Sequence, residues 1–294
     1  MKSFRVSLAA LLGAQAQVTF NDCAAKLMLV SLAQQLAVGT QTDAKSMVAL
    51  IGALLVLPYI LFGPVCGWLS DRFSKRAVFN AALLLQIGVV GLLIAVTWLQ
   101  SFHGSLACFF LLSVQTAILA PAKRGIILEY CGPERLSRYV GYMEMATIGA
   151  ILVGSWAGGT MFSMALDAGA APWGAAFNVS LVLGVLSVVA WGIFQFAAPT
   201  PAQGAQKFSW SLWIAHFRDV AEVWGEKTLW RAVMGICFFY GIGGYVSALL
   251  PQVAQETQNS GPQTGAVQGL MLLMVGVGTI FGNLSAGLFS RRGI

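Results

Sequence analysis

The sequence predicts an all-α integral membrane protein with about eight transmembrane helices, and three observations support this fold class. Hydrophobic residues make up 57% of the 294 residues and charged residues only 10%, whereas a soluble domain carries about a quarter charged residues. Apolar runs recur at close to the roughly 20 residues that a helix needs to cross a bilayer. The net charge of +6 falls in short clusters between these runs. The composition excludes a water-exposed globule, a disordered chain, a nucleic-acid partner and a disulfide framework, and it makes membrane lipid a partner.

The apolar runs divide the chain into three parts. Six runs form a predicted N-terminal six-helix bundle over residues 1–198. A cytoplasmic linker follows over 199–228, and residues 229–294 supply the first two helices of an incomplete C-terminal bundle. The second run contains Pro58 and Pro64, which a membrane helix tolerates when neighbouring helices satisfy the freed backbone groups. The eight runs cover residues 6–37, 47–69, 77–98, 104–120, 140–165, 175–198, 229–250 and 265–289.

The linker begins with the turn-forming sequence Ala-Pro-Thr-Pro-Ala-Gln-Gly at residues 198–204. Beyond it, Trp213, Phe217, Val220 and Trp224 recur at helical spacing. This pattern favours an amphipathic helix at the cytoplasmic interface. The alternative is an ordinary solvated loop that folds over the bundle.

The positions of the basic residues predict the orientation. With the N-terminus in the cytoplasm, fifteen of the seventeen Lys and Arg residues fall on the cytoplasmic side. Lys45 lies on the opposite side and Lys26 lies inside the first helix. This asymmetry follows the positive-inside rule and supports both the direction and the number of helices.

A partial repeat and close-packing glycines indicate how the helices are arranged. Residues 67–76 and 282–292 share Gly-x-Leu-Ser at the start and Phe-Ser before a basic pair at the end. Many secondary transporters consist of such repeats, with substrate sites between them. The pairs Gly63 and Gly67, Gly154 and Gly158, and Gly278 and Gly282 are expected to let helices approach closely.

The loop after the second helix carries a distinctive pattern, with residues Gly67, Asp71, Arg72, Lys75 and Arg76. Gly67 permits close helix approach, and Asp71 is suited to the positive N-terminal end of a neighbouring helix. The pattern resembles the loop signature between helices two and three of the major facilitator superfamily. The resemblance implies a gating loop, in which Arg72 and Arg76 offer fork-shaped donors to carboxylates across a cytoplasmic gate. The alternative is that the basic residues only set the topology.

Charged residues inside apolar runs are the candidate substrate-binding or coupling residues. Asp22 and Lys26 lie one turn apart on one face of the first helix, and charges at this depth are expected to face the bundle interior and pair. The pair either binds a charged or zwitterionic head group or carries a proton, or it serves only packing. Glu144 either lies in the apolar setting that a proton-coupled carrier needs or pairs with Arg138 or Arg124 at the interface.

Four short stretches resemble the lysophospholipid transporter family and the related modules fused to acyltransferases. They are Phe20-Asn21-Asp22 with Lys26, Pro121-Ala122-Lys123 at the predicted end of the fourth helix, Glu144, and the run Gly154–Gly159. The resemblance implies a carrier that moves lysophospholipid across the bacterial inner membrane for re-acylation. It assigns head-group and coupling roles to Asn21, Asp22, Lys26, Lys123 and Glu144.

The same resemblance implies two six-helix halves, so the chain is expected to be a fragment of a longer carrier or of an acyltransferase fusion. Two positions depart from the family pattern: Cys23 follows Asn21-Asp22, and Ala286-Gly287 replaces the acidic-basic pair in the second repeat.

An amphipathic drug or small-solute efflux carrier is the alternative function. Enzymatic activity is not expected, because neither His103 nor His216 has an Asp five positions later. No metal or cofactor is expected, since the two histidines and five cysteines stand singly.

Overall fold

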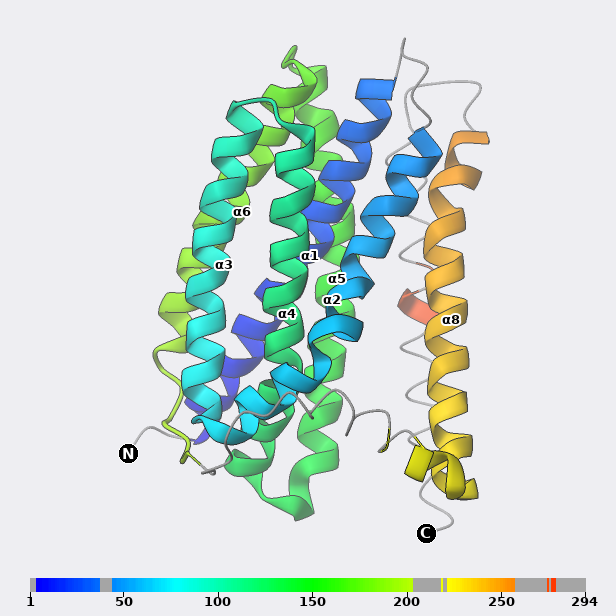
Figure 1. Cartoon of the computed structure of the whole chain (residues 1–294). Helices are drawn as coiled ribbons and strands as arrows, with labels where there is room; N and C mark the ends of the chain where they lie inside the picture. Colours follow the sequence, from blue (N-terminus) through cyan, green and yellow to red (C-terminus); the bar gives the residue numbers. More distant parts are fainter. Residues whose placement is uncertain are drawn as a thin grey trace.

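Seven long helices make up the described part of the chain. The computed structural model describes residues 4–37, 44–202, 218, 221–256, 274 and 276–278. Figure 1 shows the first six helices packed side by side as a bundle, with α8 at its edge. The helices are α1 (Phe4–Ala37), α2 (Ala44–Arg72), α3 (Lys75–Trp98), α4 (Phe102–Cys131), α5 (Leu136–Asp167), α6 (Pro172–Phe194) and α8 (Lys227–Glu256), and a 3-10 turn, η1 (Pro133–Arg135), precedes α5.

Local sequence signals begin and end these helices. Ser74 and Ser101 precede α3 and α4, and their side chains accept hydrogen bonds from the backbone N–H groups of Ala77 and Gly104. Such N-cap contacts satisfy donors that the first helical turn leaves unpaired. Gly132 ends α4 at a φ of 70°, a conformation that glycine adopts without steric cost.

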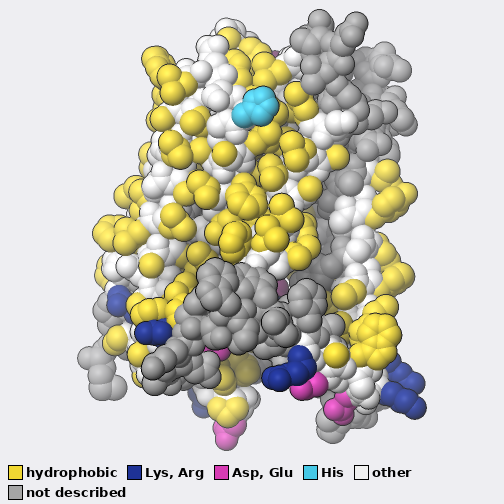
Figure 2. All heavy atoms as spheres, in the orientation of Figure 1, with side chains coloured by type: hydrophobic (Ala, Val, Ile, Leu, Met, Phe, Trp, Pro, Cys, Tyr) yellow, Lys and Arg dark blue, Asp and Glu magenta, His cyan; other side chains and the backbone are white. Residues whose placement is uncertain are grey.

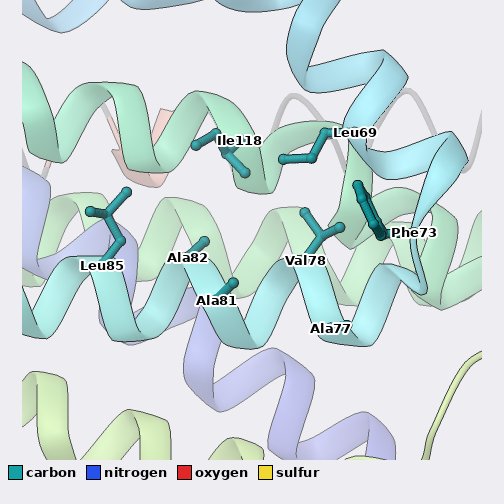
Figure 3. Close-up of a pocket in the computed structure, with 8 residues that line it drawn as sticks. All are labelled: Leu69, Phe73, Ala77, Val78, Ala81, Ala82, Leu85 and Ile118. Carbon is teal, nitrogen blue, oxygen red and sulfur yellow. The ribbon is translucent and has the colours of Figure 1, made fainter. Parts of the chain in front are cut away.

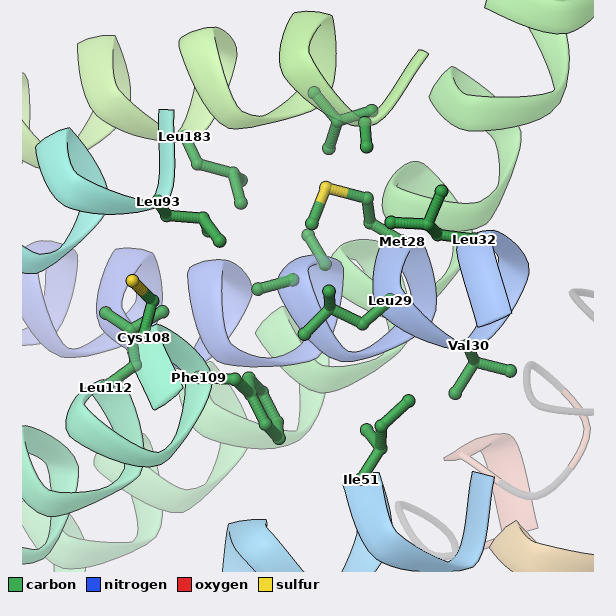
Figure 4. Close-up of a cluster of buried hydrophobic side chains, with 14 of the residues drawn as sticks. Met28, Leu29, Val30, Leu32, Ile51, Leu93, Cys108, Phe109, Leu112 and Leu183 are labelled. Atoms are coloured by element: carbon green, nitrogen blue, oxygen red, sulfur yellow. The ribbon is translucent and has the colours of Figure 1, made fainter. Parts of the chain in front are cut away.

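The core surrounds α1, which packs against α5, α6, α4 and α2. One buried cluster lies around the second half of α1, where Met28 and Leu29 meet Phe109 of α4 and Leu183 of α6 (Figure 4). A second cluster lies around its first half and includes Phe79 of α3 stacked on Phe194 of α6, with ring centroids 4.4 Å apart. The two clusters hold α1 along its whole length.

Two glycines of α5 allow an especially close crossing with α1. A Cβ atom at Gly154 would lie 2.6 Å from the Phe20 carbonyl oxygen, and one at Gly158 would overlap the Ala24 carbonyl oxygen. The predicted close approach at Gly154 and Gly158 is therefore confirmed. At Gly67, by contrast, a Cβ would meet no described atom within 4 Å, so the described residues do not make the close approach predicted there.

Six described helices are long and apolar enough to cross a membrane: α2, α3, α4, α5, α6 and α8. They confirm a multi-pass α-helical architecture of the predicted kind. The predicted first membrane run is the exception, since α1 is not among the six. It is more polar than the others because it carries Gln15, Gln17, Asn21, Asp22 and Lys26, and neighbouring helices cover most of these groups.

Several predicted boundaries are wrong. The fourth run was predicted to end at residue 120, but α4 continues through Pro121 and the basic pair to Cys131. A proline removes one backbone donor, yet the packing of α4 against α2 and α3 holds the helix together beyond it. The sixth helix ends at Phe194 rather than 198, and α8 runs to Glu256, six residues beyond the predicted end.

Other predictions concern residues outside the described part of the chain. The eighth run, residues 265–289, and the second repeat, residues 282–292, lie almost wholly there. So does most of the predicted amphipathic segment, of which residues 221–225 are helical. The three-part domain division stays a prediction.

Candidate functional site

The centre of the candidate site is the Asp22 carboxylate, which α1 carries into the interior beside α4. Its Oδ2 atom accepts a hydrogen bond of 2.7 Å from the Thr116 hydroxyl of α4. The side chain is only 7% exposed, and its second oxygen accepts no hydrogen bond from the described residues. A buried carboxylate with one open acceptor position is suited to a cationic or hydrogen-bonding ligand.

Lys123 supplies positive charge to this site. It lies on the part of α4 beyond Pro121, where it interacts electrostatically with Glu144 of α5 and with Asp22 of α1. Lys123 therefore lies within electrostatic range of both Asp22 and Glu144, although no ion pair within 4 Å joins it to either residue. Glu144 is half-buried, and it forms no ion pair within 4 Å with Arg138 or Arg124.

The predicted pairing of Asp22 with Lys26 is not observed. The two residues lie one turn apart on α1, but no ion pair within 4 Å joins them. Asp22 accepts its hydrogen bond from Thr116 of α4 and interacts electrostatically with Lys123 of the same helix, while Lys26 is half-buried. Packing against α4 therefore outweighs the local spacing on which the prediction relied.

Residues of α1, α2 and α5 complete the surroundings of Asp22. Tyr59 of α2 interacts electrostatically with Asp22 and Cys23. Cys23 also shares a hydrogen bond with Ser155 of α5. Four helices of the bundle thus contribute polar groups around one carboxylate.

Asn21 faces away from this group, toward α6 and α3. Its side-chain amide donates hydrogen bonds to the Leu183 carbonyl at 3.2 Å and to the Ser187 hydroxyl at 2.7 Å. Gln86 of α3 donates to the same hydroxyl at 3.3 Å and to Gln17 of α1 at 3.4 Å. Asn21 and Asp22 are adjacent in sequence but lie in two separate polar groups on either side of α1.

The candidate gating loop has one half that is fixed to the bundle. Lys75 forms an ion pair with Glu129 of α4, and its aliphatic stem crosses directly over Gly125, where any Cβ would overlap it. The backbone N–H of Arg76 donates to the Thr200 hydroxyl at 2.9 Å, which in turn contacts Ser74 at 3.1 Å. These contacts tie the loop to the end of α4 and to the chain that follows α6.

The other half of the loop is more open. Asp71 is exposed, and the Arg72 guanidinium lies over the rings of Trp68 and Phe73, at 5.3 and 5.6 Å from their centroids. The five predicted loop residues therefore separate into an anchored pair, Lys75 and Arg76, and an accessible pair, Asp71 and Arg72.

The model of one protein family, described as Major Facilitator Superfamily, matches residues 18–294. The chain belongs to the major facilitator superfamily.

Solved structures agree with this chain at the level of the fold. A D-xylose–proton symporter superposes with a TM-score of 0.66 at 14% identity, over 99% of this chain and 70% of the symporter chain. A bacterial homologue of the human lysosomal transporter Spinster superposes with a TM-score of 0.67 at 17% identity, over all of this chain and 64% of its own.

Curated relatives of this facilitator are named lysophospholipid transporters. The lysophospholipid transporter LplT of Cronobacter sakazakii is 29% identical over 238 residues, which cover 78% of this chain and 54% of that protein. The LplT of Serratia proteamaculans is 28% identical over 80% of this chain and 55% of its own length. The facilitator thus resembles the branch that its short motifs indicated, and it spans about half the length of these curated relatives.

Sequence reasoning missed several contributors to the site of this facilitator. Thr116 donates a hydrogen bond to Asp22, Tyr59 interacts electrostatically with Asp22, and Ser155 hydrogen-bonds to Cys23; each is a polar residue within an otherwise apolar run. That polarity is the only signal that indicates them. Glu129 of α4 is a further residue that the sequence analysis does not single out, although its acidic side chain is the partner of Lys75.

Proposed function

We propose that this facilitator carries lysophospholipid across the bacterial inner membrane, where the product is re-acylated on the cytoplasmic side. The observation that carries the proposal is the acid-base group of Asp22, Lys123 and Glu144 between α1, α4 and α5. The name of the curated relatives, lysophospholipid transporter, supports the same substrate class.

The chemistry of the group favours a zwitterionic head group over a simple cation. Asp22 offers an open carboxylate oxygen to the ammonium of such a head group, and Lys123 offers an ammonium to its phosphate. A cation exporter needs carboxylates without a neighbouring lysine. Asn21 has a positioning role in this proposal, because its amide holds α1 to α6 and faces away from the carboxylate.

The proposed orientation places the α2–α3 loop and the N-terminus on the cytoplasmic side. Figure 2 shows Lys and Arg side chains at the lower end of the visible face and the His side chain near the upper end. This distribution supports the positive-inside interpretation of the sequence.

The test measures uptake of radiolabelled lysophosphatidylethanolamine into spheroplasts of cells that express the gene from its own locus. Asp22→Asn and Lys123→Gln are expected to reduce uptake per molecule by about 10-fold or more, because each removes a charge-assisted contact worth about 1.5 to 3 kcal/mol. Asp167→Asn is the matched control, since Asp167 is an exposed carboxylate at the end of α5. Unchanged uptake in both site variants would refute the head-group role.

Export of an amphipathic drug is the alternative outcome of the same assay. In that case, uptake of the lysolipid would be absent in the parent strain and a fluorescent cationic dye would be expelled instead. A fused or partner acyltransferase is tested separately, by following whether the labelled lysolipid becomes a two-chain phospholipid inside the cell.

A further inference from the structure

An apolar groove opens on the surface of the bundle beside the α2–α3 loop. Its volume is about 300 Å³, and it lies between the end of α2, the first half of α3 and Ile118 of α4 (Figure 3). Its lining is made by the apolar side chains of Leu69, Phe73, Ala77, Val78, Ala81, Ala82, Leu85 and Ile118.

The groove faces the surroundings of the bundle and not its interior. Phe73 and Leu85 at its two ends are 45% and 42% exposed. The nine residues from Ala77 to Leu85 extend about 12 Å along α3, because each of the eight steps between them rises about 1.5 Å. Since α2, α3 and α4 are all candidate membrane spans, this length of groove is presented to the acyl chains of one leaflet.

A cation lies at the loop end of the groove. The Arg72 guanidinium lies over the ring of Phe73, 5.6 Å from its centroid, and Phe73 lines this end of the groove. Lys75 adds little to the local field, because Glu129 neutralises it. This end of the groove carries a net positive charge, because it has three basic residues (Arg72, Lys75 and Arg76) and two acidic ones (Asp71 and Glu129).

We propose that the groove binds one acyl chain of an anionic phospholipid of the surrounding membrane, with the lipid phosphate beside Arg72. The groove supplies a fully apolar lining for the chain, and the loop supplies the complementary charge at the level of the head groups. The lipid is a bound component and not the transported substrate, because the groove is separated from Asp22 by α4, whose Thr116 faces α1. The proposal is independent of the proposed transport function.

The experiment is native mass spectrometry of the purified chain in detergent, titrated with dioleoyl phosphatidylglycerol or with dioleoyl phosphatidylcholine. Ala81→Trp fills the groove from α3. The matched control is Leu84→Trp, because Leu84 lies on the same helix, is 48% exposed and does not line the groove. Arg72→Gln tests the charge.

The parent protein is expected to retain one phosphatidylglycerol molecule in preference to phosphatidylcholine. Ala81→Trp should weaken that binding by about tenfold or more, while Leu84→Trp should leave it within about twofold of the parent. Arg72→Gln should abolish the preference for the anionic lipid. Equal weakening by both Trp variants, equal binding of the two lipids, or competition by lysophosphatidylethanolamine at the same site would each overturn the proposal. A groove occupied by another part of the chain would bind no lipid in the parent, which also overturns it.

Discussion

Replacing Gly154 with alanine tests how tightly α1 and α5 cross. The new Cβ would lie 2.6 Å from the Phe20 carbonyl oxygen, whereas ordinary van der Waals contact begins at 3.4 Å. The difference of these two distances requires the helices to separate locally by about 0.8 Å. Overpacking of this kind costs about 1 to 3 kcal/mol, while alanine gains about 0.8 to 1.0 kcal/mol in helix propensity over glycine.

Gly159→Ala on the same helix is the control that separates these two effects. A Cβ at Gly159 would meet no described atom within 4 Å. Both variants gain the same propensity, so Gly154→Ala should be less stable than Gly159→Ala by about 1 to 3 kcal/mol. The assay is thermal unfolding in detergent with a thiol-reactive dye, which reports the exposure of the buried Cys66 and Cys108. If the two variants unfold at the same temperature, the crossing is looser than the structure indicates.

Three further predictions concern buried polar contacts. Glu129→Gln should destabilise the chain by about 3 to 5 kcal/mol, because it leaves the Lys75 ammonium buried without its partner. Thermal unfolding measures this loss of stability. The double variant Lys75→Met with Glu129→Leu should recover most of it. Thr116→Val removes the hydrogen bond to Asp22, worth about 1.5 to 3 kcal/mol for a charged acceptor. Lysolipid uptake by this variant should therefore fall more than its expression level does. A fall in uptake equal to the fall in expression level would contradict a role of Thr116 at the site. Ser187→Ala should cost about 1 to 3 kcal/mol of stability, since the amides of two neighbouring helices lose a shared acceptor, and a variant as stable as the parent would show that those amides find other partners.

The sequence predicts the order of the described helices and the positions of their apolar segments well because the bilayer imposes them, whereas the ends of α4, α6 and α8 differ from the prediction. A run of about 20 apolar residues has few alternatives to a helix where no water can satisfy the backbone. The prediction fails at α4, where apolarity stops at Ala120 but the helix does not. Beyond that point polar residues still have helical neighbours to pack against, so composition no longer marks the end of the element.

The partner of Asp22 is predicted wrongly for a different reason. Lys26 is the cation nearest to Asp22 along the chain, and a spacing of four residues on one helix favours it as the partner. Because α4 continues, it brings Lys123 into reach of both Asp22 and Glu144. Local spacing on one helix identifies which residues share a face, but the choice between partners on different helices depends on packing that one sequence does not reveal.

The two halves of the α2–α3 loop are held to different extents. Lys75 and the N–H of Arg76 are fixed by Glu129 and Thr200, so this half is tied to α4 and to the chain that follows α6. Asp71 is exposed at the end of α2 and takes part in neither of these anchoring contacts. If the predicted gating role holds, the contacts of Asp71 can change without breaking those of Lys75. The choice between a gating role and a purely topological role of the loop stays a prediction. The ion pair with Glu129 and the close passage of the lysine stem over Gly125 show that Lys75 anchors the loop to α4.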